Sequence, residues 1–122
     1  MEKFFRIGGR VLLSLIFIVS GLGKLFHFHD SAGMMASKGM PAASLLLAVA
    51  IAVEILGGLS VLAGFKARWA ALALVVFLIP TTLIFHNFWA FQGMVQQDQM
   101  AHFMKNLGLM GGLLLLASYS KD

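Results

Sequence analysis

Glu54 is the acidic residue with the least expected surroundings, because it interrupts the apolar stretch 42–65. An ionisable side chain inside a membrane-spanning helix costs roughly 2.5–3.5 kcal/mol on insertion scales, so it usually faces other helices. A neutral Glu54 could hydrogen-bond to Ser14 or to a backbone carbonyl group. An ionised Glu54 needs a cation, for which Arg10 and Lys105 are the candidates. Two roles stay open: a pin that holds helices together, or proton, ligand or quinone chemistry.

A second group of polar side chains opens the last apolar stretch of the chain. His102, Lys105 and Asn106 follow the spacing i, i+3, i+4, which places them on one face of a helix. Lys24 and His86 are expected at the same end of the helices. Donors that converge in this way could bind an anion or a carbonyl oxygen. Alternatively, these residues anchor the helices at the interface, with the long side chains reaching toward water.

Metal and nucleophile chemistry have weaker support. The chain has no cysteine, which excludes disulfides and zinc–thiolate sites on these residues. His27 and His29 lie near Met34 and Met35, a set of imidazole and thioether groups that suits copper. No repeated motif accompanies this set, so we predict no metal site. No serine has an identifiable histidine partner, and no complete catalytic set is visible, so enzymatic activity stays open.

The composition indicates where these residues are placed. Of the 122 residues, 60% are hydrophobic and 11% are charged, against about 45–50% and about 25% in ordinary soluble domains. A chain this short cannot bury that much apolar surface in a soluble core. The composition therefore argues against a soluble enzyme, a disordered segment and a nucleic-acid-binding module, and it predicts the lipid bilayer as the partner.

Four stretches are long enough to cross a bilayer, which takes roughly 20 apolar helical residues. They cover residues 7–26, 42–65, 69–88 and 100–119. The uncharged part of the fourth is only 107–117, so Lys105 would have to extend outward. We therefore predict an all-α integral membrane four-helix bundle, with residues 1–122 as a single domain.

The basic residues predict the orientation, because cytoplasmic segments carry an excess of lysine and arginine. They gather near both ends of the chain and in the second connection: Lys3, Arg6, Arg10, Lys66, Arg68 and Lys121. Both termini are accordingly expected in the cytoplasm. The basic start resembles a signal peptide, but no clean cleavage site follows and three more spans come after it, so we expect a retained helix.

The connecting segments and glycines add local predictions. Asp30 or Ser31 could cap a short helix in the segment after the first span, and Gly39 would end it. Gly108 and Gly112 form a small-x-x-x-small face in the fourth span. This face serves either packing within the bundle or dimerisation.

The motifs taken together resemble the DoxX family of small four-helix bacterial membrane proteins, over about residues 6–118. The matching residues are Ser20-Gly21-Leu22 with Lys24-Leu25, Gly39-Met40-Pro41, Glu54 with Gly57-Gly58, Gly64-Phe65, Arg68 with Ala70-Ala71, His86, and His102-Phe103-x-Lys105-Asn106-Leu107. The resemblance implies a multi-pass protein of the bacterial inner membrane.

The resemblance also suggests a function, because the family takes its name from a subunit associated with a thiosulfate:quinone oxidoreductase. It implies a membrane subunit or anchor of a quinone-linked redox or oxidative-stress system. The expected cofactor is a quinone, with none carried by the chain itself, and the candidate partners are a soluble or membrane oxidoreductase and a second copy of the chain. The alternatives are a small transporter or ligand-binding membrane protein with a polar intramembrane pocket, and a purely structural subunit. The predicted site has Glu54, Lys105, Asn106 and His102 inside, with Lys24 and His86 at its mouth.

Overall fold

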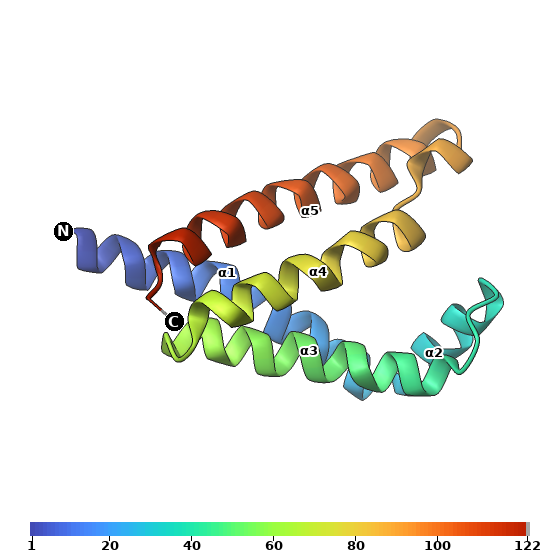
Figure 1. The fold of residues 1–122 in the computed structure, drawn as a ribbon. Helices are drawn as coiled ribbons and strands as arrows, with labels where there is room; N and C mark the ends of the chain where they lie inside the picture. The colour runs from blue at the N-terminus through green and yellow to red at the C-terminus, as the bar shows by residue number, and fades with distance from the viewer. Residues whose placement is uncertain (122) are drawn as a thin grey trace.

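The computed structural model describes residues 1–121, which are almost entirely helical. The long helices are α1 (Glu2–Phe26), α3 (Ala43–Ala63), α4 (Ala67–Phe85) and α5 (Gly93–Tyr119), and the connections contain α2 (Phe28–Ser37) and the 3-10 turn η1 (Phe88–Ala90). Within the described residues, four helices are long and apolar enough to cross a membrane. The predicted all-α membrane fold is therefore confirmed. Both termini lie at one end of the molecule, beside the tight turn between α3 and α4 (Figure 1).

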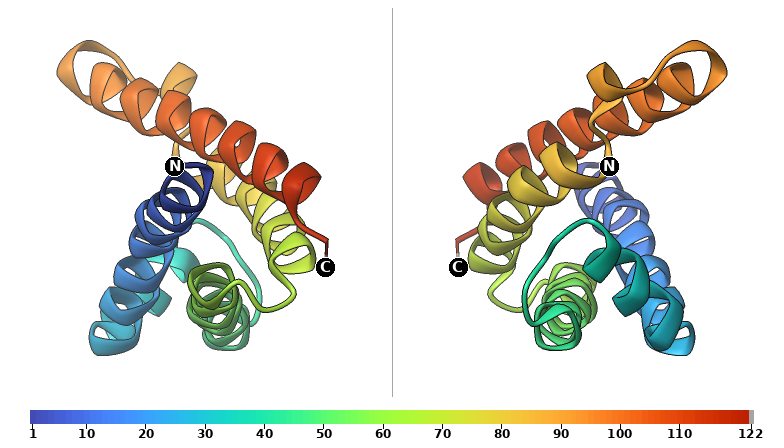
Figure 2. Two further views of the ribbon diagram at one scale, coloured as in Figure 1. Left: turned by 90° about the vertical axis from the view of Figure 1, so that its left-hand side faces the viewer. Right: turned by 90° about the vertical axis from the view of Figure 1, so that its right-hand side faces the viewer.

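The long helices pack in the order α1, α3, α4, α5, so that the first two spans along the chain are neighbours in space. Figure 2 shows α5 crossing over α4 and diverging from α1 and α3 toward the end that carries η1. Near the terminal end, α5 approaches α1, where Gly112 faces the side chain of Leu13. The bundle is therefore closed at the terminal end and spread at the opposite end.

Two groups of buried side chains form the core. The larger group draws on all four long helices and contains Phe17, Val61, Ala71, Leu74, Leu78, Leu113 and Ala117. The smaller group joins α2 to the start of α3 and contains Met35, Leu47 and Ile51. Many other large apolar side chains are exposed on the outer faces of the helices. In a membrane these side chains contact lipid, so they need no further protein cover.

The glycines of α1 and α3 determine how closely these helices approach. A Cβ atom at Gly21 would lie 2.6 Å from Cγ1 of Ile55, and one at Gly58 would lie 2.8 Å from Cγ1 of Ile18. Such distances leave no room for a side chain, so both positions need glycine for this crossing. The close approach places Gly21 level with Glu54. A Cβ atom added at Gly21 would lie 3.3 Å from the Cβ of Glu54.

Two local predictions need correction. The segment 28–37 is helical and Gly39 has a φ of +82°, as expected of a residue that stops a helix, but neither Asp30 nor Ser31 caps it. The N-cap is His27, without a side-chain hydrogen bond, because the chain passes almost directly from α1 into α2. The last helix begins at Gly93 rather than near residue 100. Its added first turns contain methionine and glutamine, which are good helix formers.

Candidate functional site

The first polar contact of the interior is an ion pair between α1 and α3. Lys24 Nζ lies 2.7 Å from Glu54 Oε1, and it also donates a hydrogen bond of 2.6 Å to Ser20 Oγ. The Glu54 side chain is 4% exposed and that of Lys24 is 31% exposed. It is the only ion pair that the structure contains between residues 1 and 121. A carboxylate this deeply buried is stabilised by the cation and by the hydrogen bond from it.

The partner of Glu54 differs from the predicted candidates. Neither Arg10 nor Lys105 pairs with it, and the hydroxyl of Ser14 donates instead to the backbone oxygen of Val11 at 2.9 Å. The reason is the crossing of the helices. Lys24 lies one helical turn beyond Gly21 and therefore close to the level of Glu54, rather than at the outer edge of the bundle.

Asn106 makes the second buried polar contact, between α4 and α5. Its amide Nδ2 donates a hydrogen bond of 3.0 Å to Thr82 Oγ1, and the two residues are 7% and 2% exposed. Asn106 therefore lies in the interior, as the sequence indicated. Its partner, Thr82, was not predicted as a site residue, although its position one turn before His86 placed it on the same helix face.

The third polar group lies where α4 ends and α5 begins. His86 Nδ1 and Gln99 Oε1 share a hydrogen bond of 2.8 Å, and the ring of His86 stacks on that of His102 with centroids 5.0 Å apart. Because an amide oxygen only accepts, the proton of this bond lies on His86 Nδ1. Lys105 Nζ is 3.5 Å from His102 Nδ1, and both of these side chains are exposed. His86 and His102 are thus brought together, whereas Lys105 and His102 lie on the surface rather than inside.

A cavity of about 700 Å³ connects the first polar group to the third. It lies between the outer halves of α3 and α4, beneath α2, and its polar wall includes Lys24, His86 and Gln99. Most of the remaining wall is apolar and includes Met34, Met35, Leu47, Val49, Phe77 and Ile84. Glu54 does not line the cavity itself but contacts it through Lys24.

The apolar wall of the cavity is partly exposed. Three of its apolar wall residues, Leu46, Val49 and Ile84, are 40%, 52% and 38% exposed. Lys38, from the connection after α2, lies with its Nζ 5.7 Å from the centre of the Phe85 ring at the rim. The cavity thus combines exposed apolar side chains of α3 and α4 with a cation at its rim.

Besides Thr82, the sequence analysis also missed Gln99 and Ser20 as polar residues of the site. Gln99 falls before the predicted start of the fourth span, so it was assigned to a connection rather than to a helix. Ser20 belongs to a motif of the resemblance, but serine is common in membrane helices and carries no signal of its own. Among residues 1–121 no group of three or more metal-ligating side chains is close enough to hold a metal ion. His27 and His29 are both exposed.

Comparison with known proteins identifies the relationship of this chain. The DoxX family model matches residues 6–87, which include most of α1, all of α2 to α4 and both residues of the Lys24–Glu54 pair. The chain belongs to the DoxX family. No solved structure matches it.

Two curated relatives of this DoxX chain match more of it than residues 6–87. The inner membrane protein YqjF of Escherichia coli K12 is 35% identical over 120 residues, which cover 96% of this chain and 87% of the relative. The inner membrane protein YphA of the same organism is 32% identical over 108 residues, or 88% of this chain and 77% of the relative. With its four candidate spans, the chain is a multi-pass inner-membrane protein.

Proposed function

We propose that this DoxX protein is a membrane subunit of a quinone-linked redox system and that it binds a quinone in the cavity between α3 and α4. The observation that carries the proposal is a cavity with an apolar wall and a cation, Lys24, held on its polar side. A quinone combines an apolar ring and tail with carbonyl oxygens that accept hydrogen bonds. The volume of about 700 Å³ also falls within the usual range for small-molecule sites, about 300–1,000 Å³.

Two polar residues of the wall, Lys24 and His86, suit the oxygen atoms of a quinone and of its quinol. Lys24 has three N–H donors, of which two are directed to Ser20 and Glu54, so one is left for a ligand. Glu54 fixes the position of the ammonium group and offsets its charge, while Lys38 is a second cation at the rim. His86 donates to Gln99 through Nδ1, so its Nε2 is an acceptor, which suits a hydroxyl of the quinol rather than a carbonyl oxygen of the quinone.

The chain's part in this proposal is to bind and orient the quinone. A quinone takes up two electrons and two protons to become a quinol, and we assign the electrons to an oxidoreductase partner. The exposed faces of the helices and the open outer end leave room for such a partner. The residues of this chain hold the carbonyl oxygens in place and exclude water from the apolar part of the cavity.

The structure favours binding over transport as the role of the cavity. Below Glu54, toward the terminal end, the interior is closed by Phe17, Leu74 and Leu113, which are 3%, 0% and 0% exposed. A transported polar solute would have to pass this layer. A ligand that enters from the bilayer and leaves by the same opening does not have to pass this layer.

Titration of the purified protein in a neutral detergent with decylubiquinone tests the proposal. We expect saturable binding that weakens about tenfold in Lys24→Met, the loss expected for one charge-assisted hydrogen bond. Lys105→Met is the matched control, because Lys105 is exposed and lies outside the cavity wall. Equal affinity of the wild type and Lys24→Met, or binding that does not saturate, would contradict the proposal.

A further inference from the structure

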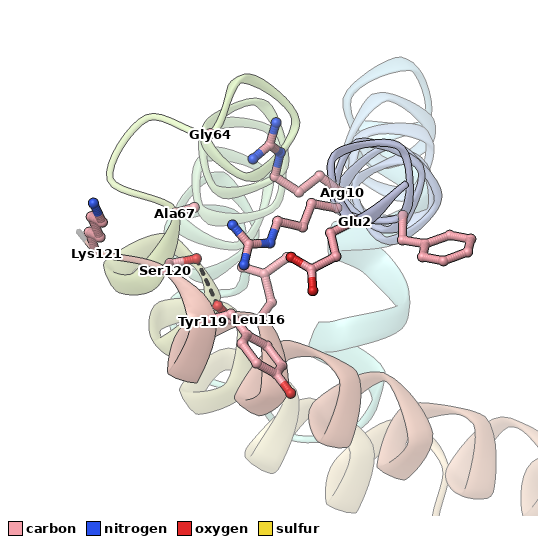
Figure 3. A pocket seen from close by; sticks show the side chains of 10 residues that line it. Glu2, Arg10, Gly64, Ala67, Leu116, Tyr119, Ser120 and Lys121 are labelled. Atoms are coloured by element: carbon pink, nitrogen blue, oxygen red, sulfur yellow. Dashed lines mark hydrogen bonds between the residues drawn. The ribbon is translucent and has the colours of Figure 1, made fainter.

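A second groove lies at the opposite end of the molecule, where both termini meet the turn between α3 and α4. Its volume is about 600 Å³, and it has no residue in common with the cavity proposed for the quinone. Among residues 1–121, three cationic residues line it, Arg6, Arg10 and Lys121, against one acid, Glu2. Figure 3 shows Arg10 and Glu2 on the α1 side of this groove, across from Leu116 and Tyr119 of α5.

Arg10 is the feature of the groove that points to a ligand. Its Nε is buried and has no hydrogen-bond partner among residues 1–121. Glu2 does not supply an acceptor for Arg10, because neither Arg6 nor Arg10 lies within ion-pair distance of Glu2 in the described chain. A guanidinium N–H buried without an acceptor is unfavourable, and an anion would supply the missing acceptor.

The backbone around Arg10 leaves space for the guanidinium group. Gly64 ends α3 with a φ of +73°, and an added Cβ there would lie 3.2 Å from both Cζ and Nη1 of Arg10. The absence of a side chain at Gly64 thus lets the planar group lie against the end of α3. In this position the guanidinium lies against the end of α3, and Arg10 also lines the groove.

We propose that this groove binds a phosphate group, presented by an anionic phospholipid or by a soluble phosphate compound. Two arginines can hold the several oxygens of one phosphate through charge-assisted hydrogen bonds, for which the planar guanidinium is well suited. Phe5 and Leu116 provide apolar wall beside the cations, where the first carbons of a lipid can pack. The groove also lies at an end of the spanning helices, the level at which lipid headgroups are found.

The test uses the purified full chain in a neutral detergent, with dioctanoyl phosphatidylglycerol and inorganic phosphate as separate probes. The blank for the lipid probe is dioctanoyl phosphatidylcholine. The blank for inorganic phosphate is sodium chloride of matched ionic strength. Binding is followed by native mass spectrometry for the lipids and by the thermal midpoint for phosphate. We expect at least one probe to bind the wild type above its blank, and Arg10→Gln to weaken that binding about tenfold.

Lys3→Gln is the matched control, since Lys3 is an exposed cation of the same helix that does not line the groove. If Arg10→Gln does not fold, Arg6→Gln replaces it, because Arg6 is exposed and its loss leaves the packing unchanged. Binding of the lipid alone identifies a headgroup as the source, and binding of inorganic phosphate alone identifies a soluble phosphate; either result supports the site. Failure of both probes, or equal losses in Lys3→Gln and the arginine variant, overturns it.

Discussion

Lys24 Nζ lies 2.7 Å from Glu54 Oε1, and this contact joins α1 to α3 inside the bundle. The pair is asymmetric, since Glu54 is almost fully buried while Lys24 borders the cavity. Loss of the lysine therefore leaves a carboxylate that no other group of the described chain neutralises. Loss of the acid leaves a cation that can still reach the cavity.

Lys24→Met is accordingly expected to destabilise the protein by about 2 kcal/mol, below the usual loss for a fully buried pair because Lys24 is partly exposed. The double variant Lys24→Met with Glu54→Leu should recover about 1 kcal/mol of that loss, because the buried charge is gone as well. Unfolding in mixed detergent micelles measures both quantities, with Lys105→Met as the control. If the stability loss of the double variant equals the sum of the losses in Lys24→Met and Glu54→Leu, the two side chains do not interact.

Glu54→Gln is expected to alter ligand binding more than folding. The amide can still accept a hydrogen bond from Lys24 but no longer offsets its charge, so decylubiquinone affinity should change while expression is largely kept. Glu54→Leu should lower both the decylubiquinone affinity and the expression yield. The comparison needs expression yield and binding on the same preparations. Equal loss of expression in the two variants, without a separate binding defect in Glu54→Gln, would leave Glu54 as a structural pin.

Gly21→Ala is expected to separate α1 from α3. The added methyl group would lie 2.6 Å from Cγ1 of Ile55, and overpacking of this kind destabilises by about 1–3 kcal/mol. Gly23→Ala is the control, because a Cβ at Gly23 meets nothing within 4 Å. Its stability should stay equal or rise slightly, since alanine is the better helix former. Similar unfolding curves for the two variants would contradict the close crossing at Gly21.

Gln99→Leu is expected to release the His86 ring. Since Gln99 Oε1 accepts from Nδ1 of His86, the wild-type protein should show the Nδ1-protonated tautomer in ¹⁵N NMR spectra of labelled histidine. The variant should shift toward the Nε2-protonated form. Gln97→Leu, an exposed position on the same helix, should leave the spectrum unchanged. A wild-type ring that is already protonated on Nε2 would argue against the His86–Gln99 bond.

Single-cysteine labelling is expected to place both termini in the cytoplasm. The chain has no cysteine of its own, so each introduced thiol is read without background. Lys38→Cys should react with a membrane-impermeant maleimide in intact spheroplasts, whereas Lys66→Cys should react only after the membrane is permeabilised. The reason is the excess of basic residues at the end that carries the termini and Lys66. The reverse pattern would invert the predicted orientation.

Much of the architecture could be predicted from the sequence, because hydropathy is a local property. A run of about 20 apolar residues can only be satisfied as a helix in a bilayer, since every backbone polar group must be bonded within the segment. The same argument places a rare polar residue against other helices, and it correctly put Glu54 and Asn106 in the interior. The motifs likewise identified the DoxX family before any contact was known.

The polar partners depended on the tertiary structure. Lys24 was expected at a mouth and Lys105 inside, yet Lys24 bonds to Glu54 and Lys105 is exposed. The sequence analysis estimated the depth of each residue as if the spans were straight and parallel. The estimate fails for both residues, because α1 crosses α3 at Gly21 and α5 diverges from these two helices. The sequence by itself determined which residues must avoid lipid. Only the packing of small residues between helices decided which of them meet, because that depends on how closely two backbones approach and at what level they cross.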